Sequence, residues 1–115
     1  MARFDPSPYL PLTPAMFQVL VALADGEKHG YAVIKEVARR TDGQVRLRAG
    51  TLYTVIRRFV DDGLIQESAE RPDPALDDER RRYYRLTERG RAVAVAEARR
   101  MAETLAQARA KLGTI

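Results

Sequence analysis

One stretch decides the fold, and it reads Arg46-Leu-Arg-Ala-Gly-Thr-Leu-Tyr-Thr-Val-Ile-Arg-Arg-Phe-Val-Asp-Asp-Gly63. It predicts one amphipathic helix over residues 49–62, with Gly63 as its C-terminal stop. Its apolar residues recur at the i, i+3, i+4, i+7, i+8 spacing and make one core-facing stripe. The stripe consists of Leu52, Val55, Ile56, Phe59 and Val60.

The opposite face of this helix carries hydroxyl and guanidinium groups and no carboxylate before Asp61. At about 100° per residue, it holds Gly50, Thr51, Thr54, Arg57 and Arg58, with Tyr53 on its flank. Such side chains reach phosphates and base edges in a major groove. An ordinary solvated face has the same composition, so the neighbouring elements must decide between the two interpretations.

Composition sets broad limits. The chain has 115 residues, enough for one domain with a modest core. It lacks both an apolar run of about 18 residues and the apolar region of a secretory signal. It has no cysteine, which fits a reducing compartment. We therefore expect a cytoplasmic protein without a membrane contact, whose net charge of +4 mildly favours an anionic partner.

Upstream of this stretch, residues 1–12 contain three prolines and are expected to form an extended N-terminal arm. The apolar residues of the arm suit a contact with a partner subunit, and a frayed terminus fits the same pattern. Thr13 and Pro14 then supply an N-cap and a proline at the first helical position. A first helix therefore starts here, and it stops at Asp25-Gly26.

A second helix is expected to start at His29 and to end before Asp42. Residues 45–47 are too few for more than a single strand bridge. Because the connections are short, these two helices and that of residues 49–62 must fold back on one another over a common core.

After Gly63 the pattern changes to strands. Residues 64–68 and 81–86 predict two strands, and the polar stretch 70–79 between them must turn the chain. Along the second strand, Tyr84 and Leu86 are expected to face the core, and Arg81, Tyr83 and Arg85 the solvent. Three helices followed by a β-hairpin wing predict an α+β, mainly α, winged helix-turn-helix over residues 13–86.

The last segment, residues 87–115, predicts one long helix capped by Thr87 and Glu88. Its apolar positions alternate in steps of four and three, as in a heptad seam. They are Ala94, Ala98, Met101, Leu105, Ala108 and Leu112. Two partners fit the seam, the first helix of the same chain or a second copy. We expect a second copy, because a domain of this size leaves little core for so long a helix, with Phe17 and Val21 joining the interface.

The residues of this sequence do not support hydrolytic, redox or metal chemistry. His29 is the only histidine and cysteine is absent, so one chain assembles neither a metal cluster nor a His-dependent triad. The acidic residues Asp73, Asp77, Asp78 and Glu79 fall in the expected wing loop, which does not preorganise a carboxylate pair. We expect that the protein is not an enzyme and that it binds neither a cofactor nor a metal. We expect the His29 side chain to satisfy a backbone group at the start of its own helix.

The arginines are placed where a winged helix gathers them on one side. Arg46 and Arg48 precede the third helix, Arg57 and Arg58 lie on its outer face, and Arg80, Arg81, Arg82 and Arg85 follow the returning wing strand. This is the charge footprint of a duplex binder. A salt-bridged surface against Glu67, Glu70 and Glu79 is the alternative interpretation.

Four motifs occur in order along the chain. They are His29-Gly30-Tyr31-Ala32-Val33-Ile34, Gly50-Thr51-Leu52-Tyr53, Asp62-Gly63-Leu64-Ile65 and Arg82-Tyr83-Tyr84-Arg85-Leu86-Thr87-Glu88-Arg89-Gly90. With these motifs the chain resembles the PadR family of bacterial transcriptional regulators, over about Leu12 to Gly90. Its single C-terminal helix is similar to that of the shorter PadR subfamily.

The resemblance implies a homodimer built by the first and last helices, which binds palindromic operator DNA and represses transcription. It also implies a small aromatic or drug-like effector that releases the DNA and enters a pore between the C-terminal helices. Two departures bear on this mechanism. Thr54 stands where many members have proline, which implies a different groove contact. The chain has no tryptophan to sandwich an aromatic effector, so another effector or none is expected.

We therefore expect a sequence-specific, homodimeric DNA-binding repressor, and the alternative is a winged-helix scaffold whose basic face binds an acidic protein. Thr51, Tyr53, Thr54 and Arg58 would read bases, while Lys35, Arg48, Arg57 and the wing arginines would hold phosphates. The complete DNA-binding set is Lys35, Arg48, Gly50, Thr51, Tyr53, Thr54, Arg57, Arg58, Arg81, Arg82 and Arg85. The dimerisation set is Phe17, Val21, Ala94, Ala98, Met101, Leu105, Ala108 and Leu112.

Overall fold

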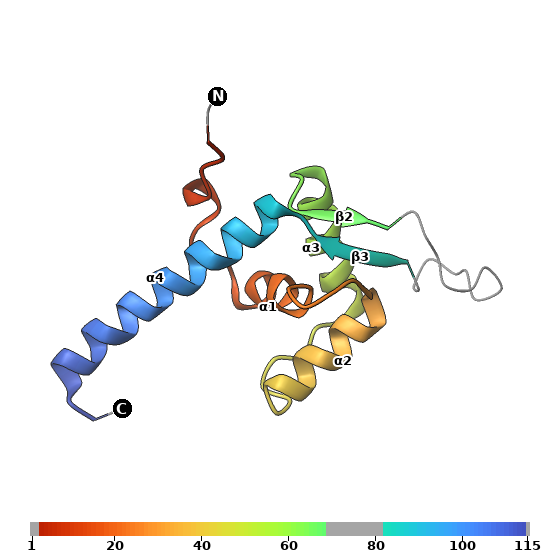
Figure 1. Ribbon diagram of the computed structural model, residues 1–115. Helices are drawn as coiled ribbons and strands as arrows, with labels where there is room; N and C mark the ends of the chain where they lie inside the picture. The colour runs from red at the N-terminus through yellow and green to blue at the C-terminus, as the bar shows by residue number, and fades with distance from the viewer. Residues whose placement is uncertain (1–2, 69–81, 115) are drawn as a thin grey trace.

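The computed structural model describes residues 3–68 and 82–114. Its helices are α1 (Pro14–Ala22), α2 (Gly30–Arg40), α3 (Ala49–Asp61) and α4 (Glu88–Leu112), preceded by the single 3-10 turn η1 (Ser7–Tyr9). Its strands are β1 (Lys28–His29), β2 (Ile65–Glu67) and β3 (Tyr83–Leu86). Figure 1 shows α1, α2 and α3 gathered beside the small sheet, while α4 extends away from them toward the C-terminus. This is the predicted winged helix-turn-helix with a long last helix.

Helix starts lie where side-chain caps predict them. Thr13 Oγ1 accepts from the Met16 N–H at 3.2 Å, with Pro14 at the first helical position. His29 Nδ1 accepts from the Ala32 N–H at 3.0 Å, which confirms its expected role at the start of α2. Thr87 Oγ1 accepts from the Gly90 N–H at 3.1 Å and starts α4. These signals are local, so the sequence alone carries them.

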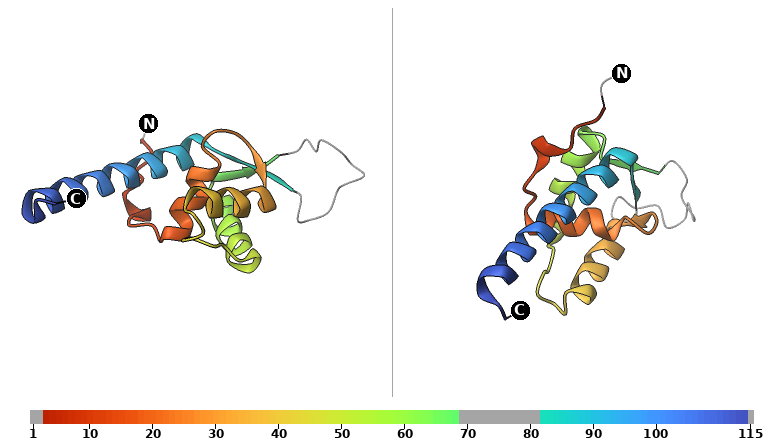
Figure 2. Two further views of the ribbon diagram at one scale, coloured as in Figure 1. Left: turned by 90° about the horizontal axis from the view of Figure 1, so that it is seen from below. Right: turned by 60° about the vertical axis from the view of Figure 1, so that its left-hand side comes forward.

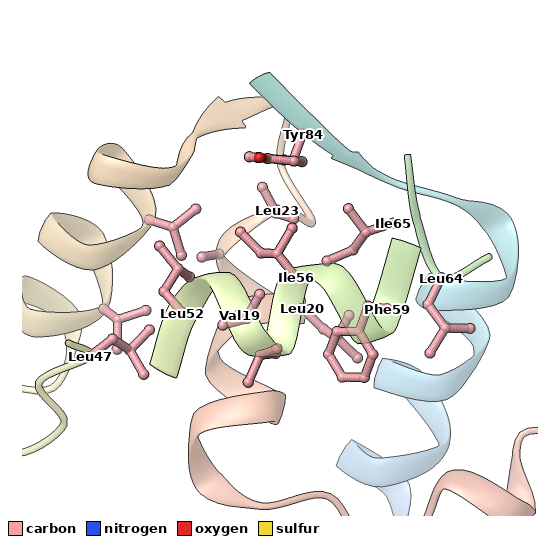
Figure 3. Packing of buried hydrophobic residues seen from close by; sticks show 14 of the residues in the cluster. Val19, Leu20, Leu23, Leu47, Leu52, Ile56, Phe59, Leu64, Ile65 and Tyr84 are labelled. Atoms are coloured by element: carbon pink, nitrogen blue, oxygen red, sulfur yellow. The ribbon is translucent and has the colours of Figure 1, made fainter. Parts of the chain in front are cut away.

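The core is built around the inner face of α3. Leu52, Val55, Ile56 and Phe59 are all buried, and Figure 3 shows three of them lying against residues of α1, the sheet and the turn after α3. Val60 is an exception, because it is 37% exposed. Its assignment to the core stripe was therefore wrong. The helical stripe predicted from spacing is wider than the surface that the rest of the chain covers.

The sheet is antiparallel, with β3 between β1 and β2. Ile65 pairs with Leu86, and Lys28 pairs with Tyr84. Tyr84 is buried and Arg85 is exposed, as the alternation predicts, whereas Tyr83 is only half-exposed.

The third strand of the sheet was not predicted from the sequence. Residues 45–47, too few for more than a single strand bridge, are irregular, and β1 is the third strand. β1 has two residues, too few for any alternation to show in the sequence.

The N-terminal arm differs from the extended segment that its prolines predict. It contains the turn η1, which packs against α4. Asp5 Oδ1 accepts from the Ser7 N–H at 3.0 Å and from its hydroxyl at 2.7 Å, and these hydrogen bonds lower the pKa of Asp5. Proline at the first positions of a helical turn costs no hydrogen bond, so three prolines exclude a long helix but not this turn.

Helix α4 divides into two parts. In residues 88–97, hereafter the anchored half, Gly90, Val93 and Glu97 are buried. In residues 98–112, hereafter the projecting half, every residue is exposed except Ala108, which is half-exposed. The left view of Figure 2 shows the projecting half extending away from the rest of the chain.

None of the helices in residues 3–68 and 82–114 combines the length and the apolar character needed to cross a bilayer.

Candidate nucleic-acid interface

The outer face of α3 is exposed in the way its sequence predicts. Gly50, Thr51, Thr54, Arg57 and Arg58 all face solvent, as does Arg48 at the N-cap position. The first turn of α3 contains no acidic residue, and Arg48 makes no side-chain cap hydrogen bond. The N–H groups at this helix end are therefore available to an external acceptor.

Thr54 makes a hydrogen bond within α3. Its hydroxyl donates to the Gly50 carbonyl oxygen at 2.9 Å. The side chain is exposed, so its methyl group and the lone pairs of its oxygen remain accessible from outside.

Tyr53 has a packing contact that the sequence did not reveal. It is half-buried, and a Cβ built on Gly30 would lie 2.6 Å from its hydroxyl oxygen. Gly30, buried at the start of α2, is therefore the residue that lets this ring approach. Tyr53 joins α2 to α3, and this contact limits how far its ring extends toward a groove.

A row of aromatic rings leads from the wing to the outer face of α2. The His29 ring lies 5.6 Å from that of Tyr83, edge-on at 87°, and stacks on that of Tyr31 at 6.5 Å and 13°. Lys35 Nζ lies 4.7 Å from the centre of the Tyr31 ring, a cation–π contact. Tyr31 is 55% exposed, and sequence reasoning missed it as a surface residue. The signal that could have found it is its i, i+4 spacing with Lys35.

The two described wing arginines differ in their contacts. Arg82 Nε lies 3.4 Å from a Glu67 carboxylate oxygen, so the salt-bridged alternative applies to this residue. Arg85 is exposed and donates to Gln66 Oε1 from Nη2 at 2.8 Å and from Nε at 3.2 Å. Arg81 and the acidic wing-loop residues 73–79 lie outside the described residues.

Between α3 and the wing lies an open groove of about 440 Å³. Tyr53, Ile56, Arg57, Val60, Asp61, Glu67, Arg82 and Tyr84 line it. Among the described residues that line it, two arginines are matched by two carboxylates. This groove explains why Val60 remains accessible at the edge of the core.

The predicted dimerisation residues fall into two groups. Ala94 and Phe17 are half-buried and pack against the core of the same chain, and Val21 is half-exposed. Met101, Leu105 and Leu112 are 45%, 41% and 68% exposed, and Ala98 is exposed beside them. The first helix of the same chain therefore contacts a part of α4, and a second copy on the exposed projecting half stays a prediction.

Three helices, a β-hairpin wing and a basic outer face on the third helix define a winged helix-turn-helix protein. A PadR family transcription regulator from hypervirulent Clostridium difficile has this fold, with a TM-score of 0.70 and 21% identity, covering 87% of this chain and 99% of that one. A structure of BpsR from Bordetella bronchiseptica is 32% identical with a TM-score of 0.58, covering 81% of this chain and 64% of that one.

Sequence comparison is more specific than fold comparison. Transcriptional regulator Rv3488 of Mycobacterium tuberculosis is 39% identical over 89 residues, which are 77% of this chain and 76% of that protein. Residues 19–96 match the Transcriptional regulator PadR-like family. The chain belongs to this family of transcriptional regulators.

Proposed function

We propose that this regulator is a homodimeric repressor that inserts one α3 helix from each subunit into successive major grooves of an operator. The observation that carries the proposal is the outer face of α3. Thr51, Thr54 and Arg58 are exposed on one face, beside a helix start without a side-chain cap. Hydroxyl and guanidinium groups on such a face match the donors and acceptors of base edges.

Phosphate contacts would come from the surroundings of α3. Lys35, Arg48 and Arg57 are exposed, and so is Arg85 on the wing. Arg82 would have to leave Glu67 before it could hold a phosphate, because the two side chains form an ion pair at 3.4 Å. We assign Arg81 to the phosphate-binding set on sequence grounds alone. Gly50 contributes by leaving space at the start of the helix, since nothing lies within 4 Å of a Cβ at this position.

The second copy would be held by the projecting half of α4. Met101, Leu105 and Leu112 present apolar surface there without cover from their own chain. An antiparallel or parallel pair of such helices buries this surface in the manner of a coiled coil. The two half-sites would then lie about 34 Å apart, one helical turn of DNA.

The proposal also includes a small-molecule effector. In Bordetella bronchiseptica BpsR, 6-hydroxynicotinic acid regulates the binding of that protein to DNA. By analogy, a small aromatic or drug-like molecule would regulate the present chain. The chain has no tryptophan, so a tryptophan sandwich is not part of its site.

Gel shifts at several salt concentrations test the DNA role, with duplexes from the promoter of the protein's own gene and random duplexes of equal length. With about six to ten phosphate contacts per dimer, affinity should fall about 10³–10⁵-fold between 50 and 200 mM salt. A duplex interaction insensitive to salt would refute the proposal. Binding to an acidic protein but to no duplex would instead support the scaffold alternative.

Two arginine variants separate base reading from phosphate binding. Arg58→Ala should weaken operator binding by about 1–3 kcal/mol and reduce the preference over random DNA. Arg85→Ala on the exposed wing strand should weaken both duplexes alike. Equal losses on both duplexes for both variants would contradict the assignment of Arg58 to a base edge.

A further inference from the structure

A buried carboxylate lies where α4 leaves the winged-helix domain. Glu97 is 1% exposed, although it belongs to a helix that is otherwise half in solvent. Its Oε2 accepts from the Leu12 N–H at 2.5 Å, across 85 residues of sequence. Its Oε1 accepts from Arg100 Nε. Burying a carboxylate is costly unless its oxygens are hydrogen-bonded, and here both are.

The charged state of Glu97 suits these contacts. The hydrogen bond from Arg100 is the main cause that lowers the pKa of Glu97, and the Leu12 N–H acts in the same direction against desolvation. The carboxylate is therefore ionised at neutral pH. The DNA contacts proposed above do not involve Glu97.

Glu97 is also the last fixed point on α4. Before it, Thr87 Oγ1 donates to the Gly63 carbonyl at 2.7 Å, Arg91 Nη2 donates to the Ala24 carbonyl at 2.8 Å, and Val93 is fully buried. After it, the projecting half has no buried residue. The direction of the projecting half is thus determined by contacts that end at Glu97.

A small change of direction at this point becomes a large displacement. At 1.5 Å per residue, Leu112 lies about 22 Å along the helix from Glu97. Tilting this segment by about 10° moves its far end by about 4 Å, which is comparable with one base-pair step of DNA. In a dimer joined through the projecting halves, such a tilt changes the distance between the two α3 helices.

We propose that Glu97 is a positioning residue for operator recognition. By tying the arm at Leu12 to α4, it fixes the angle between the winged-helix domain and the projecting half. This angle fixes the separation of the two recognition helices and therefore the half-site spacing that the dimer accepts. The inference rests on the proposed dimer.

The separation can be measured without knowing the operator. The chain has no cysteine, so Asp61→Cys, exposed at the end of α3, gives one spin-label site per subunit. Double electron–electron resonance on the full-length dimer should give one narrow distance distribution. Adding Glu97→Ala should broaden or shift this distribution while light scattering still shows a dimer.

Control variants separate positioning from general damage. Glu103→Ala removes an exposed carboxylate from the projecting half and should leave the distribution unchanged. Glu97→Gln keeps an acceptor for the Leu12 N–H but loses the charge that faces Arg100, so its broadening should be intermediate. If Glu97→Ala does not fold, Glu97→Gln decides the question. A distribution with both the mean distance and the width of the wild type in the folded Glu97 variant would overturn the proposal.

The same samples distinguish failure of this inference from failure of the proposed function. A monomeric wild type would refute both. A dimer with a Glu97-dependent separation but without duplex binding would refute the proposed DNA-binding function and would leave only the role of Glu97 in setting the separation of the two α3 helices. On duplexes whose half-site spacing is changed by one or two base pairs, Glu97→Ala should lower the preference for one spacing by about tenfold. An unchanged preference would overturn the positioning role even if overall affinity fell.

Discussion

The two halves of α4 belong to one continuous helix and have opposite surroundings. The anchored half lies against α1 and the arm, and its residues Gly90, Val93 and Glu97 are buried. The projecting half carries Met101, Leu105 and Leu112 into solvent. Figure 1 shows the contrast directly, since α4 passes the arm and α1 and then continues alone.

The difference shows that sequence periodicity and burial are separate properties. A heptad seam runs through both halves, yet the domain covers only the first one. Isolated helices shorter than about 12–15 residues are marginal in water, so most helical stability in proteins comes from packing of an apolar face. The projecting half therefore depends on the anchored half for its start and, in our proposal, on a second copy for its apolar face.

The largest effect should come from Gly90→Ala, which disrupts the packing of the anchored half against the winged-helix domain. A Cβ at this position would lie 2.1 Å from the Leu64 carbonyl oxygen, a backbone atom that cannot rotate away. We expect a loss of about 3 kcal/mol in the free energy of unfolding, measured by urea denaturation. Gly50→Ala is the matched control, because its Cβ meets nothing within 4 Å. It should stabilise α3 by about 0.5–1 kcal/mol.

Leu105→Glu should have an effect of similar size, and it tests the projecting half. A charge in an apolar interface without a partner costs about 3 kcal/mol or more, so the dimer should dissociate about a hundredfold more readily. Multi-angle light scattering should show monomers, and circular dichroism should show that the winged-helix domain remains folded. Gln107→Glu places the same charge on the opposite face of the helix and should leave the dimer intact. A dimeric Leu105→Glu protein would show that the seam has another role.

A smaller effect should appear in the pH dependence of stability at the boundary of the two halves. The pKa of Glu97 is lowered in the folded protein. Its stabilisation is therefore complete above the unfolded value of about 4.3 and is lost as pH falls through the folded value. The difference in unfolding free energy between wild type and Glu97→Gln should be constant near neutrality and shrink in acid. A difference that grows in acid would contradict the sign of this shift.

The smallest effect concerns a single contact of the anchored half. Arg91→Ala removes the hydrogen bond to the Ala24 carbonyl and should cost about 0.5–1 kcal/mol, because Ala24 is only half-buried and its carbonyl can accept from water instead. Arg99→Ala, exposed in the projecting half, should change stability by less than about 0.5 kcal/mol. Thermal unfolding of both variants measures whether the arginine of the anchored half contributes more to stability than the arginine of the projecting half.

Sequence alone predicted most of the fold because its signals were local. Thr13, His29 and Thr87 cap the helices that follow them, and each cap needs only a neighbouring N–H group. The exposed face of α3 was likewise predicted from its period. The family motifs agree with these elements, and the structure explains their glycines, since Gly30 makes room for Tyr53 and Gly90 for the Leu64 carbonyl.

The features that the sequence missed depend on contacts between distant residues. Glu97 looks like any other carboxylate on a long helix with an arginine three residues on, and only the arm that packs beside it adds the Leu12 N–H as a second donor. Lys28 belongs to the sheet because it pairs with Tyr84 of β3, although its own strand, β1, has only two residues. Tyr53 contacts α2, whereas its position on the helical wheel suggested a free flank. No local sequence pattern predicts these contacts of Glu97, Lys28 and Tyr53.

The hydrogen bond from Thr54 to the Gly50 carbonyl has a consequence for the operator. While that bond holds, the hydroxyl has no proton to give, and it offers only lone pairs and a methyl group. In a major groove, the lone pairs match the amino groups of adenine and cytosine, and the methyl group matches that of thymine. Guanine presents only acceptors on its major-groove edge. In the complex proposed above, a bond inside the protein thus disfavours guanine at the base that Thr54 would face.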